Sequence, residues 1–135
     1  MGAAERLEAL ERVSAGLGRL RELGPIGELL RLAPAELSDS CRLDRVLLTR
    51  IKDSELVPCH AFFKDDPDGA EQAVQELRER PLALAYPLIE AELMRRRRAT
   101  IVERANGRAQ SPPLPVPEGH SYVAAPVVLD GRPIG

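Results

Sequence analysis

The chain is poor in aromatic residues, which make up 3% of its 135 residues and include no tryptophan. Aliphatic side chains must therefore build the core, and few rings are left to stack on nucleic-acid bases. A strong charge of one sign is also lacking, because 21 acidic residues offset 19 basic ones and leave a formal net charge of −2. Direct nucleic-acid binding is not expected, since such proteins carry a clearly basic surface.

Cysteines and long apolar runs are scarce as well. The two cysteines, Cys41 and Cys59, are too few for a disulfide framework and are expected to be free thiols. No stretch approaches the roughly 20 apolar residues of a membrane span, and residues 1–11 lack the apolar block of a signal peptide. We therefore expect a cytoplasmic protein with no membrane partner.

An amphipathic helix is predicted over residues 3–23. Leu10, Val13, Leu17 and Leu20 follow a 3-4-3 spacing and share one side of this helix. Gly16 and Gly18 each weaken it by about 1 kcal/mol relative to alanine, so the helix needs a packing partner. Two interpretations stay open: the side packs on its own domain, or it is the seam of a homodimer.

The following segments alternate helix and strand signals. We expect a helix over 26–40, which Pro34 kinks or restarts, and then a hairpin of strands 43–51 and 56–63 with an edge position for Pro58. A helix capped by Asp66 should then end before Pro81, with Ala70, Ala73, Val74 and Leu77 on its buried side. After it we expect a helix over 88–97, a strand over 99–102, an irregular loop over 106–119 and a long strand over 122–129.

The last residues predict an incomplete hairpin. Asp130-Gly131 is a strong type I′ turn signal, and a returning strand of about five or six residues should follow it. Only Pro133-Ile134-Gly135 is present. The expectation is that the chain is a fragment, that another chain supplies the strand, or that the sheet edge stays open to pairing.

Four segments together resemble the GAF domain: LDRVLLTRI, LVPCHAFF, PLIEAELMRRRRATIV and SYVAAPVVLDGRPIG. The chain is similar to the N-terminal sensory regions of actinobacterial regulators with a LuxR-type helix-turn-helix. The resemblance implies an α+β fold with an antiparallel sheet flanked by helices, truncated before its last strand and helix. It implies one domain over 1–135, with residues 1–23 as a leading helix and 24–135 as the sheet and its helices.

The same resemblance implies a non-catalytic sensory domain that binds a small apolar molecule and signals through homodimerisation, in transcription regulation. The alternative is an interaction module of the same fold without a ligand. The implied pocket residues are Tyr86, Ile89, Leu93, Ile101, Tyr122 and Ala124. The Asn-Lys-x-Phe-Asp signature of cyclic-nucleotide-binding members is missing, so cyclic nucleotides are not expected.

Residues capable of metal binding or covalent catalysis are few and scattered. Cys41, Cys59, His60 and His120 have no metal-ligand spacing, and adjacent residues such as Cys59 and His60 point to opposite faces of a strand. We therefore expect no metal, no cofactor and no catalytic pair. The run Arg95–Arg98 is interpreted as the basic end of a helix rather than as a phosphate-binding patch.

Overall fold

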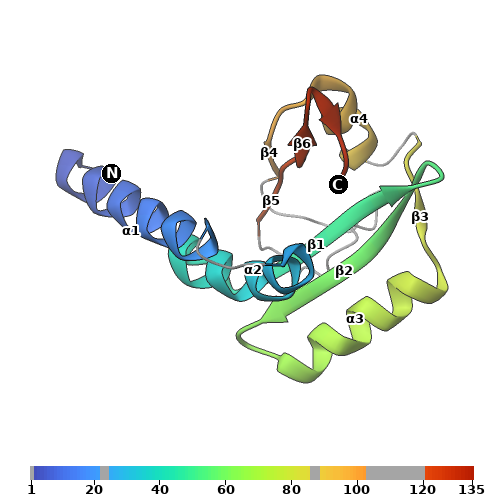
Figure 1. Ribbon diagram of the computed structural model, residues 1–135, viewed down its shortest axis with the longest axis horizontal. Helices are drawn as coiled ribbons and strands as arrows, with labels where there is room; N and C mark the ends of the chain where they lie inside the picture. The colour runs from blue at the N-terminus through green and yellow to red at the C-terminus, as the bar shows by residue number, and fades with distance from the viewer. Residues whose placement is uncertain (1, 22–24, 86–88, 103–120) are drawn as a thin grey trace. The chain divides into compact units, whose positions relative to one another are not determined.

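The computed structural model describes residues 2–21, 25–85, 89–102 and 121–135 (Figure 1). It contains helices and antiparallel sheets, which confirms the predicted α+β class. The chain divides into two compact units, one formed by Met1–Leu48 with Cys59–Val74 and the other by Thr49–Pro58 with Gln75–Gly135. The predicted loop over 106–119 lies outside the described residues.

Two helices open the chain. Helix α1 spans Ala3–Arg21 and α2 spans Ile26–Cys41, close to the predicted ranges. The predicted restart at Pro34 is wrong, because α2 is one helix with a fully buried Pro34 inside it. The helix ends at Arg42, which has a left-handed φ of 55° and donates its backbone N–H to the Ser38 carbonyl.

The predicted hairpin consists of β1, Arg45–Lys52, and β2, Glu55–Phe63. Asp53 and Ser54 turn the chain with φ angles of 52° and 60°, as a two-residue type I′ turn requires. Strand β3, Leu82–Ala83, completes the order β1-β2-β3, so β2 as a whole is the central strand. The edge position predicted for Pro58 nevertheless holds locally, because β3 pairs only with Glu55 and Leu56 and ends before reaching the proline.

Helix α3 spans Pro67–Glu79 and begins as its sequence predicts. The Asp66 carboxylate accepts a hydrogen bond of 3.0 Å from the Gly69 N–H, which satisfies one of the amides left unpaired in the first turn. The predicted inner side is confirmed: Ala70, Ala73 and Leu77 are buried and Val74 is half-buried.

The remaining elements are short. They are α4, Ile89–Arg96; β4, Thr100–Val102; β5, Tyr122–Ala124; β6, Val128–Leu129; and β7, Arg132–Pro133. The predicted continuous strand over 122–129 is wrong: β5 pairs with β4, and β6 pairs with β7. Pro126 lies in the gap between β5 and β6 and cannot donate to a ladder. The Asp130-Gly131 hairpin is confirmed, with φ angles of 50° and 75°.

The residues after this hairpin lie against β1, within the second unit. The Ile51 N–H of β1 donates to the Ile134 carbonyl at 2.8 Å, and the Val127 N–H donates to the Gly135 carbonyl at 2.8 Å. A Cβ on Gly135 would overlap the Thr49 carbonyl and lie 3.3 Å from the Arg50 Cα, so only glycine permits this approach. The short return after the turn therefore begins to pair with the edge of β1.

Each unit has its own buried side chains. Among the described residues, the first unit buries Pro34, Phe63, Ala70 and Ala73, and the second buries Leu56, Leu77 and Leu93. Within 2–21, 25–85, 89–102 and 121–135, no helix is both long and apolar enough to span a membrane.

Candidate functional site

A close helix–helix contact in the first unit joins α1 to α2. Gly16 of α1 is buried, and a Cβ built on it would overlap the Ser40 hydroxyl and lie 2.9 Å from the Ser40 Cβ. Real Cβ atoms do not come this close, so the absence of a side chain at Gly16 allows the helices to touch. The glycine that weakens α1 as an isolated helix therefore has a packing role.

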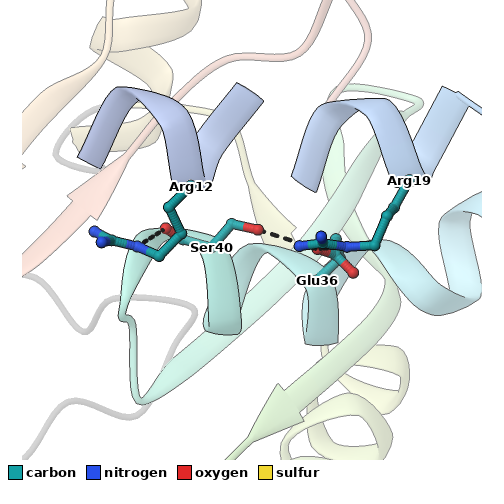
Figure 2. A network of polar contacts seen from close by, with 4 residues as sticks. All are labelled: Arg12, Arg19, Glu36 and Ser40. Atoms are coloured by element: carbon teal, nitrogen blue, oxygen red, sulfur yellow. Dashed lines mark hydrogen bonds and ion pairs between the residues drawn. The ribbon is translucent and has the colours of Figure 1, made fainter. Parts of the chain in front are cut away.

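Hydrogen bonds from polar side chains stabilise the same contact between α1 and α2 (Figure 2). The Arg12 Nε donates a 2.7 Å hydrogen bond to the Ser40 carbonyl, one of the carbonyls that the end of α2 leaves unpaired. The Arg19 Nε donates to Glu36 Oε1 at 2.8 Å, and the buried Ser40 hydroxyl donates to the same oxygen at 3.1 Å. The bonds from the two arginines link two turns of α1 to the last two turns of α2, and the Ser40 bond within α2 holds the Glu36 carboxylate in place.

This network makes one end of the helix pair sensitive to acid. The hydrogen bond from Arg19 is the largest cause that holds the pKa of Glu36 below its ordinary value. A carboxylate with a lowered folded-state pKa stabilises the fold above its unfolded pKa of about 4.3, and that contribution is lost as the pH falls through the folded value.

We expect Glu36→Gln to remove this part of the acid sensitivity. Urea unfolding measured between about pH 6 and pH 3 should show a shallower loss of unfolding free energy for the variant than for the unmodified chain. Arg19→Gln, which removes the side chain whose hydrogen bond lowers the pKa of Glu36, should make the slope shallower in the same way. Equal slopes for Glu36→Gln and the unmodified chain would contradict the role of the pair.

The packing on α2 divides the apolar residues of α1 into two groups. Val13 and Leu20 of the predicted seam are half-buried, whereas Leu10 and Leu17 are 68% and 47% exposed. Leu7 is 58% exposed and extends the second group. We call Leu7, Leu10 and Leu17 the leucine stripe. The dimer seam itself stays a prediction, and the structure leaves two of its four residues open to a partner.

The residues of the implied ligand pocket do not all share one face. Tyr122 and Ala124 of β5 are half-buried, and Leu93 of α4 is buried. Ile101 pairs with Val123, which alternates with Tyr122 and Ala124, so Ile101 lies on the other face of the β4–β5 pair and is 70% exposed. Tyr86 lies outside the described residues, as does the side chain of Ile89. Ligand binding by this set stays a prediction.

The cysteine and histidine candidates form no cluster in the part of the chain that the structure describes. Cys41 and Cys59 are half-buried and are not joined in a disulfide, as expected. No group of three or more Cys, His, Asp or Glu residues able to hold a metal occurs among the described residues. His120 lies outside the described residues.

The arginine run ends α4. Arg95 and Arg96 pair with Glu92 at 2.6 and 2.7 Å, and Arg97 takes a left-handed φ of 56° just after the helix. The Arg97 N–H donates to the Leu93 carbonyl at 2.7 Å. The run therefore lies where a helix dipole favours cations, which agrees with its interpretation as a helix end.

Sequence patterns give little indication of the α1–α2 contact. Gly16, Ser40 and the Arg19–Glu36 pair carry it, and none belongs to an apolar stripe or a known motif. The available signal is Gly16 itself, because a glycine kept inside a helical pattern usually has a packing or functional reason.

Comparisons of the chain with models of known protein families, with curated proteins and with solved structures gave no match. The resemblance to GAF domains thus stays a prediction, and the function must be argued from the chain's own residues.

Proposed function

We propose that this chain is a non-catalytic interaction module of a regulatory protein, and that two copies associate through the leucine stripe of α1. The observation that carries the proposal is the exposure of Leu7, Leu10 and Leu17 on a helix whose other side is fixed to α2. Large apolar side chains aligned on one exposed helix face are typical of association surfaces.

The attachment of α1 to α2 supports this function in a second way. Arg12, Gly16 and Arg19 hold the helix by a close backbone approach and directed hydrogen bonds. A helix fixed in this way presents the leucine stripe with little further loss of conformational freedom on binding. Such preorganisation lowers the cost of association.

A GAF-like architecture is the finer form of the proposal. The hydrogen bond between Ile51 of β1 and Ile134 supports it, because the family places the strand after the Asp-Gly turn inside the sheet. In this form α1 is the leading helix through which a sensory domain dimerises. The interaction module is favoured over the small-molecule sensor, because Ile101 lies on a different face from Tyr122 and Ala124.

We expect Leu10→Glu to abolish self-association without unfolding the chain. Leu10 is 68% exposed, so the introduced glutamate should lower the stability of the separate copy very little. The associated pair, in contrast, would bury two carboxylates. Dissociation should become at least about a hundredfold easier, measured by analytical ultracentrifugation over a concentration series.

The control is Ala15→Glu, which places the same charge on α1 at an exposed position away from the leucine stripe. It should associate as the unmodified chain does, and circular dichroism should show equal helix content for both variants. A monomeric unmodified chain at all concentrations, or a Leu10→Glu variant that associates normally, would refute the proposed function.

A further inference from the structure

The exposed side of α1 carries a heptad pattern that continues beyond the leucine stripe. Steps of four and three residues alternate along it, and all of its members are exposed: Ala3, Leu7, Leu10, Ser14, Leu17 and Arg21. This alternation averages 3.5 residues, which is the period of a two-helix seam. At about 100° per residue, the seam lies roughly a third of a turn from the side that Gly16 turns to α2.

Opposite charges flank the seam. Arg6 immediately precedes Leu7, and Glu11 immediately follows Leu10, so the two side chains border the seam on opposite sides. In a parallel, in-register helix pair, consider the residue that immediately precedes the first seam position of a heptad. It faces the residue of the other helix whose number is five higher. Arg6 of each copy would therefore face Glu11 of the other, and the two-fold axis repeats the pair.

The antiparallel alternative lacks this complementarity. Keeping the seam residues level in opposite directions aligns Leu7 of one copy with Leu17 of the other, which brings Glu11 of each copy against Glu11 of the other. Both are exposed carboxylates, and like charges that face each other across a helix pair are unfavourable. The parallel pair gains two Arg6–Glu11 attractions against one Arg21–Arg21 repulsion at the end of the seam, so charge favours the parallel orientation.

We infer that two copies of this chain pair through α1 in parallel and in register, with each residue of the leucine stripe against its counterpart and Arg6 paired with Glu11 of the other copy. The inference rests on the proposed self-association and adds its orientation. Each α2, fixed to another side of its own α1, would flank the central pair.

Charge exchange at these two positions tests the orientation. Sedimentation equilibrium would compare the dissociation constants of the full chain, of Arg6→Glu, of Glu11→Arg and of the double exchange. Each single variant should dissociate about tenfold more readily, because two attractions become two repulsions. The double exchange, and an equimolar mixture of the two single variants, should return to within roughly threefold of the original value.

The possible outcomes distinguish a failure of the inferred orientation from a failure of the proposed function. If Arg6→Glu leaves association unchanged, Arg6 does not face Glu11 of the other copy, and the parallel arrangement is overturned. If the unmodified chain associates but the double exchange restores nothing, the orientation is wrong while the proposed function stands. If the unmodified chain never associates, both fail.

Discussion

Replacing Phe63 by alanine is expected to remove about 3–5 kcal/mol of unfolding free energy, the usual cost of deleting a buried phenyl ring. Phe63 is 1% exposed and is the largest fully buried side chain described. The Arg45 guanidinium lies 4.8 Å from its ring centroid, and the Arg45 Nε donates to Asp65 at 3.0 Å, which holds the cation in place. The variant loses the ring packing and the cation–π contact together.

The neighbouring Phe62 provides a matched control. It is the same residue type on the same strand, but it points to the opposite face and is 37% exposed. Phe62→Ala should lose less than about 1 kcal/mol in urea or thermal unfolding, as surface substitutions usually do. Comparable losses for the two variants would mean that Phe63 does not sit in the core of the first unit.

Local sequence signals predicted the ends of the elements well. Asp66 begins α3 because its short carboxylate reaches the free amides of the next turn, and this needs no distant partner. Asp130-Gly131 turns the chain because both residues accept positive φ, which is again a local property. Signals of this kind lie within four or five residues and can be read directly from the sequence.

Two predictions depended on a distant partner, and one of them was wrong. Pro58 indicated an edge position, which it has only because β3, more than twenty positions later in the chain, pairs with Glu55 and Leu56 and stops there. The alternation over 122–129 indicated one strand, but the partners differ on either side of Pro126: β4 for the first part and β7 for the second. Periodicity describes the faces of a strand and says nothing about what its edges meet.

The candidate site shows the same limit. Leu10, Val13, Leu17 and Leu20 look equivalent on a helical wheel, and the sequence could not say which of them α2 would cover. Gly16 and Ser40 decide this, because their close approach fixes the rotation of α1 about its own axis. A seam predicted from four residues thus becomes an inner pair, Val13 and Leu20, and an outer pair, Leu10 and Leu17.

Matched alanine substitutions on α1 test that close approach. Gly18 has nothing within 4 Å of its would-be Cβ, so Gly18→Ala should stabilise the chain by about 1 kcal/mol through helix propensity alone. Gly16→Ala gains the same propensity, but its methyl group meets a buried Ser40 whose Cβ cannot rotate away. Overpacking of this kind costs about 1–3 kcal/mol, so the net change should have the opposite sign or be near zero.

Amide hydrogen exchange shows which part of the chain each glycine substitution affects. Gly16→Ala must move α1 off α2, so exchange should quicken near Glu36 and Ser40 as well as in α1, whereas Gly18→Ala should slow exchange in α1. Stabilisation of equal size by both substitutions would show that the helices do not touch at Gly16. Because that contact determines which leucines face outward, the same result would also remove the geometric basis for association through the leucine stripe.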